Sequence, residues 1–137
     1  MNKDIGKNAE RELTHLLERF GFKAVRIPTS NSSSNPLPDV FAVKGNVLLS
    51  IEVKSTWREK VKVRENQVRK LFQFSSLFPL TSFNLIVVKF KRREWRVFQL
   101  NAVKEVEVSI EGGEELESFL SSLEEKIDFK SLVEASA

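Results

Sequence analysis

Two carboxylates, Asp39 and Glu52, are expected to face each other across a tight β-hairpin. Apolar runs flank a Gly-Asn pair at 45–46, and glycine at the first central position suits a two-residue type II′ turn. In the register that this turn sets, Asp39 and Glu52 are cross-strand partners, with Cβ atoms about 5 Å apart. Like charges repel at that distance, so the pairing predicts a cation between them and hence a metal-dependent enzyme.

Lys54 is predicted to share a face with Glu52, because side chains two residues apart on a strand point the same way, about 7 Å apart. Two carboxylates suit a hard ion such as Mg²⁺, with water filling its remaining positions. Such an ion makes water a nucleophile at neutral pH, and a nearby ammonium offsets charge that builds up on a phosphate. The pattern favours phosphodiester hydrolysis over the alternative of a surface hairpin with solvated side chains.

The composition indicates a soluble, intracellular protein. A chain of 137 residues is long enough for a real core, so we expect one domain over 1–137, with a frayed tail at 128–137. The absence of cysteine excludes disulfides and thiolate-bound zinc or iron–sulfur clusters. The sequence shows no signal peptide and no apolar run near the ~18 residues of a membrane span, so no membrane partner is expected.

The net charge of +3 conceals an uneven distribution. Residues 1–100 hold 19 Lys/Arg and 9 Asp/Glu, a net charge of +10, whereas residues 101–137 hold 3 and 10, a net charge of −7. A basic body predicts a polyanionic partner. We interpret the acidic C-terminal segment as a solvated surface.

The elements that must position these residues are mixed helices and strands. We expect helices at about 5–20, 64–78 and 114–126, strands at 22–27, 83–90 and 94–100, and a short strand or turn within 103–110. Asp4 suits the N-cap of the first helix. A polar, turn-forming loop at 28–38 leads into the hairpin and is expected to lie beside the site.

Glu10 lies at the border of the apolar stripe of the first helix, about 85° from its centre on a helical wheel. From there its carboxylate can join the hairpin pair, giving three acidic groups around one cation. His15 lies on the polar side of the same helix, and we assign it no role.

Basic residues alternate with valines at 60–64, which puts Lys60, Lys62 and Arg64 on one face of an extended segment. This face is a candidate phosphate contact, and with Gln67 of the next helix it makes up the candidate DNA-binding residues. Gln67 falls within the apolar arc of the next helix, and two interpretations stay open: it satisfies a backbone group, or it faces the active site. Trp57 can pack on a sugar or base, although we favour packing in the core or in an interface.

Five runs of sequence resemble a known family. The order helix, strand, loop, PD hairpin, E-x-K and helix is similar to the core of the PD-(D/E)xK nucleases, which have the restriction-endonuclease-like fold. Pro38-Asp39, twelve further residues and EVK at 52–54 match that motif. The match is most similar to archaeal Holliday junction resolvases of the Hjc/Hje type at NAERE (8–12), RIPTS (26–30), NPLPDV (35–40), IEVKS (51–55) and VRENQ (63–67). The resemblance covers about residues 1–100.

The resemblance implies an α/β protein with a central mixed β-sheet flanked by helices. It implies a homodimeric, Mg²⁺-dependent endonuclease, with Mn²⁺ as a substitute, which cuts two opposed strands of four-way DNA junctions in recombination and repair. Carried over by position, Glu10, Asp39 and Glu52 would be metal ligands, Lys54 would stabilise the transition state, and Ser30 would contact the scissile phosphate. A junction resolvase needs two symmetric cuts, and the broad apolar face of the second helix is a candidate dimer interface.

Two other functions stay open. One is a PD-(D/E)xK nuclease that acts on sequence-specific duplex, nicked or flap DNA. The other is an architectural DNA-binding protein that does not cut. The matches around Ser30 and Gln67 favour the junction resolvase over another nuclease. The full set of Glu10, Asp39, Glu52 and Lys54 argues against a binding protein, because binding alone does not need opposed carboxylates facing a phosphate.

Overall fold

The computed structural model describes residues 2–28, 35–91 and 93–125, without the side chains of residues 2–5. The predictions for Ser30 and for the tail at 128–137 fall outside these residues. The described elements are α1 (Asn2–Arg19), β1 (Lys23–Arg26), β2 (Val40–Lys44), β3 (Val47–Thr56), β4 (Lys60–Val63), α2 (Glu65–Ser75), β5 (Thr81–Phe90), β6 (Trp95–Leu100), β7 (Val106–Ser109) and β8 (Glu114–Glu115). Residues 116–125 are also helical. Among these residues, no helix is long and apolar enough to cross a membrane.

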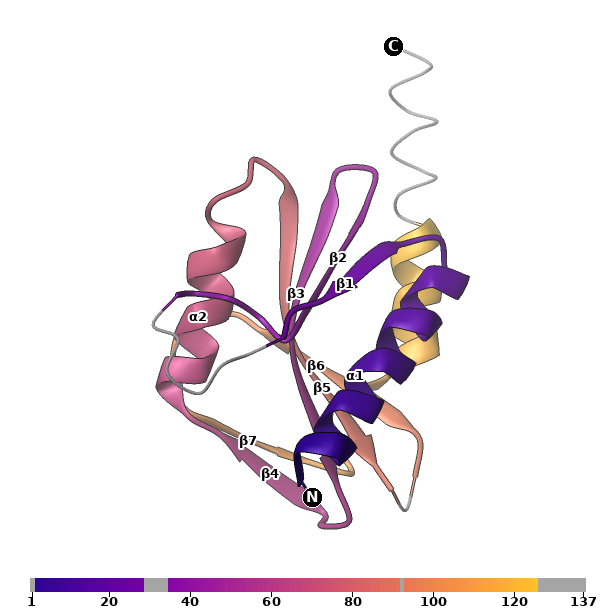
Figure 1. Ribbon diagram of the computed structural model, residues 1–137, viewed down its shortest axis with the longest axis vertical. Helices are drawn as coiled ribbons and strands as arrows, with labels where there is room; N and C mark the ends of the chain where they lie inside the picture. The colour runs from indigo at the N-terminus through magenta and orange to yellow at the C-terminus, as the bar shows by residue number, and fades with distance from the viewer. Residues whose placement is uncertain (1, 29–34, 92, 126–137) are drawn as a thin grey trace.

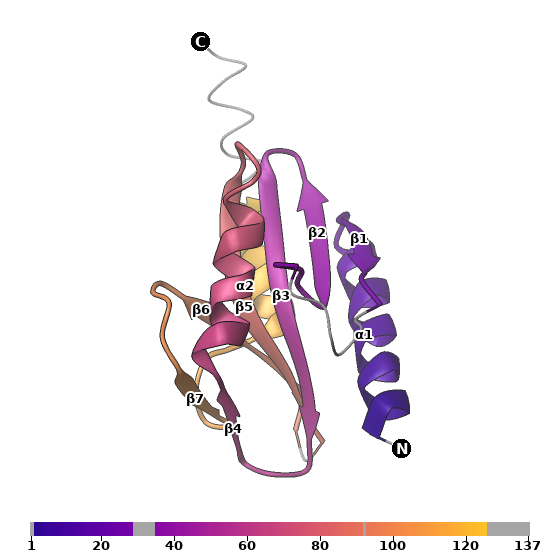
Figure 2. The ribbon, with the colours of Figure 1, turned by 60° about the vertical axis from the view of Figure 1, so that its left-hand side comes forward.

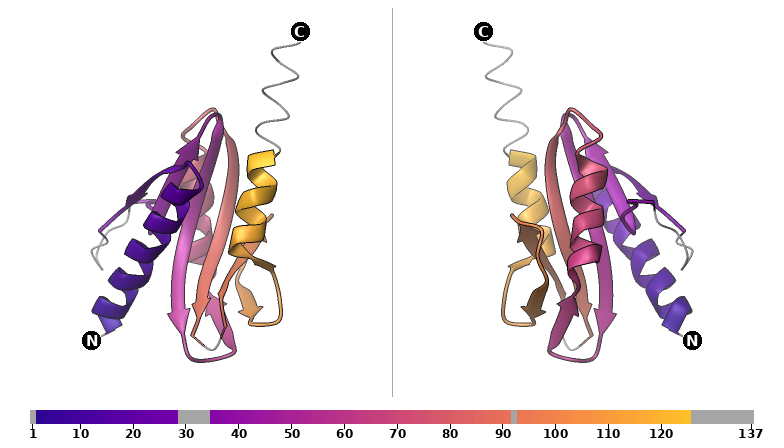
Figure 3. Two further views of the ribbon diagram at one scale, coloured as in Figure 1. Left: turned by 90° about the vertical axis from the view of Figure 1, so that its right-hand side faces the viewer. Right: turned by 90° about the vertical axis from the view of Figure 1, so that its left-hand side faces the viewer.

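Six strands form one mixed sheet in the order β1-β2-β3-β5-β6-β8, and β4 pairs with β7 in a small second sheet. Strands β3 and β5 are parallel, and the other neighbouring strands of the large sheet are antiparallel. Parallel neighbours need a crossover connection, which here contains β4 and α2. Strands β3 and β5 run the length of the sheet (Figure 3). The expected central mixed sheet flanked by helices is confirmed.

Helices cover both faces of the large sheet. α1 and the helical segment 116–125 lie side by side against one face (Figure 1), where they share a core with alternate residues of β3 from Val47 to Val53. α2 lies against the other face (Figure 2). Because Glu52 and Lys54 alternate with the buried positions, they project towards the α2 side. Val53 points into the core, as predicted.

The hairpin has the predicted register. Pairing runs from Lys44 with Val47 along the whole of β2. The φ angle of Gly45 is +58°, and none of the described non-glycine residues has a positive φ. A type II′ turn needs positive φ at its first central residue alone, whereas type I′ needs it at both. The register therefore brings Asp39 beside Glu52, one step beyond the last pair.

Several boundaries differ from the prediction. α1 begins at Asn2, so Asp4 lies inside the helix and does not cap it. β3 continues past the EVK motif, after which a loop was expected, to Thr56, because its parallel pairing with β5 continues to that residue. α2 ends at Ser75, earlier than expected. Residues 114–115, which were expected to be helical, instead pair with β6 as an edge strand.

Candidate active site

Asp39 immediately precedes β2, which lies between β1 and β3 in the sheet. Its backbone N–H donates to the Ile51 carbonyl of β3 (3.0 Å), and its own carbonyl accepts from the Ile27 N–H just after β1 (2.9 Å). Its side-chain Oδ2 accepts from the backbone N–H of Val53 (2.9 Å). Hydrogen bonds to both neighbouring segments therefore fix this carboxylate beside Glu52.

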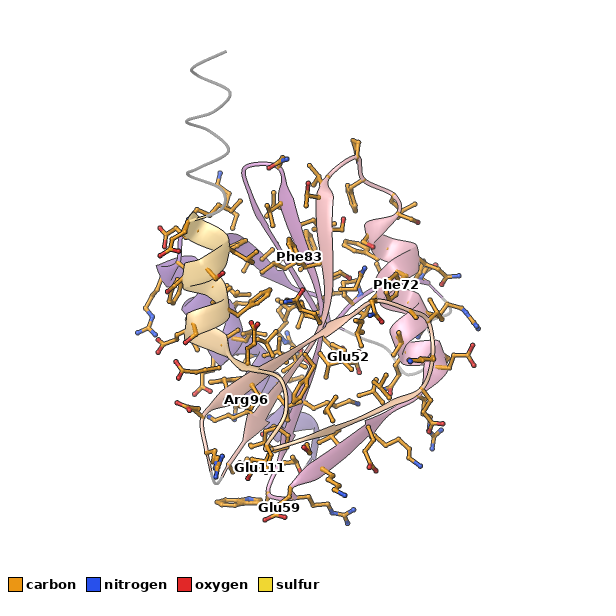
Figure 4. The ribbon with its side chains drawn as sticks, turned by 180° about the vertical axis from the view of Figure 1, so that it is seen from behind. Glu52, Glu59, Phe72, Phe83, Arg96 and Glu111 are labelled. Carbon is orange, nitrogen blue, oxygen red and sulfur yellow. The ribbon has the colours of Figure 1, made fainter. Side chains whose placement is uncertain are left out.

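Glu52 projects from β3 in the middle of the molecule (Figure 4). Its Oε2 accepts from Lys54 Nζ at 3.3 Å and from Gln67 Nε2 at 3.2 Å. The carboxyls of Glu52 and Asp39 lie close enough that each affects the pKa of the other. The structure thus brings together the predicted carboxylate pair, the predicted lysine and the glutamine of α2.

Burial raises the pKa of both paired carboxyls. For Asp39 the main cause is desolvation, which outweighs the opposing effects of the Val53 N–H and the Lys54 charge. Desolvation and then the charge of Asp39 raise the pKa of Glu52 to about 7, against the effect of Lys54. Two carboxyls that share a buried site cannot both ionise readily. Near neutral pH the pair therefore tends to retain one proton.

Gln67 connects the carboxylate pair to the start of α2. Its Oε1 accepts from the backbone N–H of Arg64, the N-cap residue, at 3.1 Å, while its Nε2 donates to Glu52. The two interpretations left open by the sequence are therefore both realised in one side chain. Because the cap contact fixes the amide on the helix, it also fixes the direction from which Glu52 receives its hydrogen bond.

Glu10 approaches the pair from α1 and is held by Arg26 of β1. Arg26 Nε donates to Glu10 Oε1 at 2.9 Å, and the two side chains are 19% and 15% exposed. Burial and then the charge of Asp39 raise the pKa of Glu10, whereas Arg26 opposes the rise. Glu10 therefore lies near enough to Asp39 for the charge of Asp39 to affect it, and its membership of the carboxylate group stays a prediction.

The carboxylates of Asp39 and Glu52 fit a hard divalent cation. Two neighbouring, largely buried carboxyls whose ionisation is costly offer oxygen ligands that a cation can satisfy together. Within residues 2–28, 35–91 and 93–125, no group of three or more His, Cys, Asp or Glu side chains is arranged to hold a metal ion. Glu10, the predicted third ligand, is bonded to Arg26, so its role as a ligand stays a prediction.

The predicted DNA-contacting strip is formed in part. Lys60 and Lys62 are both exposed on β4, and Arg64 is exposed just after it. Strand β7 places acidic side chains against the strip: Glu107 is the register partner of Lys62, and Glu105 Oε1 lies 3.8 Å from Lys62 Nζ. Part of the charge of Lys62 is therefore neutralised locally.

Two cations near the carboxylates were missed in the sequence. Arg26 lies on a strand of four residues, too short for a clear pattern, and its contact with Glu10 arises from the packing of α1 on β1. Lys70 lowers the pKa of Asp39 through its charge. The spacing of three residues between Gln67 and Lys70 on one helix was the signal that could have identified it.

Comparisons with known proteins agree with this geometry. The family model described as "Archaeal holliday junction resolvase (hjc)" matches residues 1–128. A crossover junction endodeoxyribonuclease Hje of Saccharolobus islandicus is 56% identical over 133 residues, 96% of this chain and 98% of the relative. The Hje protein of Sulfolobus acidocaldarius is 57% identical over 122 residues, 88% of each chain.

A solved structure has the same fold. The Holliday junction resolvase Hjc of Archaeoglobus fulgidus aligns with a TM-score of 0.67 and 28% sequence identity. The alignment covers 77% of this chain and 88% of that one. The fold class expected from the sequence is thus confirmed by a related structure as well as by the sheet order.

The raised pKa of Glu52 predicts how the stability of the metal-free protein depends on pH. The folded-state pKa of about 7 lies above the ordinary value of 4.5, so the folded state holds a proton that the unfolded state has released. The free energy of unfolding should therefore fall as the pH rises from about 4.5 to 7, by on the order of 3 kcal/mol. Chemical denaturation with chelator at pH 5 and pH 8 measures this fall.

In Glu52→Gln the fall should be much smaller, because the amide does not ionise. Glu18→Gln serves as the matched control, since Glu18 is an exposed carboxylate on the surface of α1. If Glu52→Gln kept the full pH dependence of the wild type, the buried pair would not be its source.

Proposed function

Because the chain belongs to the archaeal Holliday junction resolvase family, we propose that it is a structure-selective endonuclease that resolves four-way DNA junctions. The observation that carries this proposal is the largely buried Asp39–Glu52 pair with Lys54 beside it. Such a pair suits phosphodiester hydrolysis, because cleavage needs cationic charge and an activated water next to the phosphate. In this role the protein makes paired nicks in opposed strands during recombination and repair.

We propose that Asp39 and Glu52 hold Mg²⁺, for which Mn²⁺ can substitute. The chemistry expected of the ion is activation of water and neutralisation of phosphate charge. Gln67 orients the Glu52 carboxylate, and the Val53 N–H orients that of Asp39. Both carboxylates are thereby preorganised, which reduces the reorganisation that binding a cation requires.

Lys54 is the proposed electrostatic catalyst. Its ammonium lies 3.3 Å from Glu52 Oε2 and is 28% exposed, so it can meet a phosphate that approaches from solvent. There it offsets negative charge that develops in the transition state. Glu10 is proposed as a further ligand, with Arg26 holding its carboxylate in place, and Ser30 is proposed to contact the scissile phosphate.

We further propose that the protein acts as a homodimer through an apolar patch formed by Val25, Phe41, Leu77 and Phe78, beneath which Phe74 is buried. Val25 and Phe41 are cross-strand partners on β1 and β2, and Val25 is 49% exposed. The rings of Phe41, Phe74 and Phe78 are in contact in series, with centroids 5.2 Å apart at each step. Leu77 is 68% exposed at the end of α2. An apolar patch of this kind suits a two-fold interface, which would give the two sites that paired cuts need.

The proposed activity is tested on a labelled four-way junction and on its matched linear duplex, with Mg²⁺ and with chelator. We expect Mg²⁺-dependent, symmetric cutting of the junction. Asp39→Asn and Glu52→Gln should each slow cutting at least about a hundredfold, because losing a metal ligand costs at least as much as losing a group that orients one. Both variants should still bind the junction, since removing negative charge does not weaken contact with a polyanion.

Glu18→Gln is again the control and should cut like the wild type. Equal cutting of junction and duplex would indicate a nuclease with another DNA target. A junction that is bound but never cut would favour an architectural protein. Loss of binding in Asp39→Asn and Glu52→Gln would contradict the assignment of the metal site.

If the DNA-contacting strip of Lys60, Lys62 and Arg64 binds phosphates, removing it should change the salt dependence of junction binding. Replacing Lys60, Lys62 and Arg64 together by alanine should lower the slope of log K against log salt by about one unit per lost phosphate contact, two to three units in all. Titrations of junction binding at several salt concentrations give this slope. A control triple variant at Arg19, Lys23 and Lys104 removes the same charge from other exposed positions. Equal slopes in the two variants would place the DNA elsewhere.

The dimer predicts a change of mass in solution. Leu77→Asp introduces a charge into the apolar patch at an exposed position, so it should leave the fold intact and shift the protein from dimer to monomer. Sedimentation equilibrium measures the mass, and junction cutting should change from paired to single nicks. Val103→Asp, at another exposed apolar residue, is the control. An unchanged dimer in Leu77→Asp would exclude this patch as the interface.

A further inference from the structure

Trp57 lies on the surface, although its size favoured packing in the core. It is 65% exposed, immediately after the end of β3. Leaving a tryptophan in water forgoes the burial of a large apolar side chain. Exposed aromatic side chains at functional surfaces supply contact area for a partner. The residues around the Trp57 ring indicate which kind of partner fits.

The segment that carries Trp57 is held at both ends. The Lys91 N–H donates to the Thr56 carbonyl (2.9 Å), and the Arg58 N–H donates to Thr56 Oγ1 (2.9 Å). On the far side, the Glu59 carbonyl accepts from the Ile110 N–H (2.8 Å). Figure 4 shows Glu59 and Glu111 near each other at this end of the sheet, away from Glu52. The indole is therefore presented from a fixed backbone, which lowers the entropy lost on binding.

One face of the indole lies against a cation. Lys91 Nζ is 5.5 Å from the ring centroid of Trp57. Trp57 is still 65% exposed with Lys91 over the ring, so most of the indole remains available to a partner. A flat, largely exposed ring that is backed by a cation is suited to stacking with one more planar group.

The surrounding charge selects the kind of partner. Residues 54–64 and 89–96 each contain five Lys/Arg and one Glu. Acidic side chains of other segments pair with part of this charge, at Lys62, Lys89 and Arg93. Among the described residues, the cations that remain available beside Trp57 are Arg58, Lys60 and Lys91. Both segments meet at the Thr56–Lys91 hydrogen bond beside Trp57. Such a surface suits the phosphates of a nucleic acid, and the planar group beside them is then a base.

We propose that Trp57, backed by Lys91, is a stacking platform for an unpaired base near the branch point, and that it contributes to the choice of branched over linear DNA. Trp57 follows Glu52 by five residues, roughly 17 Å of extended strand, which corresponds to about five base steps of DNA. In an intact duplex the bases at that distance are paired and stacked. A branched substrate has a discontinuity where a base can turn out. The proposal rests on the proposed function, in which the substrate is branched DNA.

The test compares Trp57→Ala, Trp57→Phe and the wild type in chelator, with a four-way junction and its matched duplex. Trp57→Ala should weaken junction binding by roughly ten- to a hundredfold and duplex binding by less than about threefold, because stacking on an aromatic side chain requires an unpaired base. Trp57→Phe should restore most of the junction affinity. The salt slope should stay unchanged in both variants, since neither removes a phosphate contact.

A second readout follows the base itself. Junctions carrying 2-aminopurine at single positions from one to six nucleotides from the crossover should show one position whose fluorescence is quenched by the wild type and by Trp57→Phe but not by Trp57→Ala. Val103→Ala, a change at another exposed apolar residue, should behave like the wild type.

Three outcomes would overturn the proposal. In the first, Trp57→Ala prefers the junction over the duplex as strongly as the wild type does, and the wild type cuts junctions normally. This result would remove the stacking platform and leave the resolvase function in place. Another is a loss of dimer mass in Trp57→Ala by sedimentation, which would make the surface a contact between subunits. The third is a wild type that neither binds nor cuts junctions, which would remove the proposed function and this proposal with it.

Discussion

The burial of two facing carboxyls is the constraint on which the site depends. Asp39 and Glu52 lie side by side at the start of β2 and on β3, and burial makes their simultaneous ionisation costly. The surrounding chain offsets part of this cost: a backbone N–H reaches Asp39, and an ammonium and an amide reach Glu52. An uncharged pair of side chains at 39 and 52 would not need these three contacts. The contacts with Val53, Lys54 and Gln67 therefore indicate that the fold retains ionisable groups here that packing alone would not favour.

The same constraint explains why α2 is placed as it is. Gln67 reaches Glu52 from a helix that begins at Glu65, and its Oε1 bond to the N–H of the N-cap residue Arg64 stabilises that start. The Gln67 side chain thus links the N-terminus of α2 to the site. If α2 began at another residue, the hydrogen bond to Glu52 would be displaced. The small β4–β7 sheet leads into this helix start. Its pairing is accordingly part of what positions the site.

The sequence predicted features that depend on local rules. The Gly-Asn turn sets the hairpin register by its φ requirement, and strand alternation then places Lys54 with Glu52 and Val53 in the core. Contacts between segments far apart in the sequence could not be predicted in the same way. The Arg26–Glu10 pair needs α1 to pack on β1, and the pairing of 114–115 with β6 follows from strand neighbours that no local pattern specifies. Gln67 was recognised as unusual, but its two partners lie 3 and 15 residues away, and only the assembled fold shows that both are reached.

Charge balance gives a reason for the ion pair between Glu10 and Arg26. Take the five groups that act most strongly on one another at the site, Glu10, Asp39, Glu52, Arg26 and Lys54, and set aside Lys70, whose charge affects the pKa of Asp39 least. With Glu52 protonated, two negative charges face two positive ones, and the cluster is neutral. If a divalent cation replaces that proton, Glu52 ionises and the cluster carries one net positive charge, the complement of one phosphodiester. Without Arg26 the same cluster would be neutral with the cation bound, and attraction of the scissile phosphate would fall to contacts farther away. The ion pair that holds Glu10 can therefore be understood as part of how the site attracts its substrate.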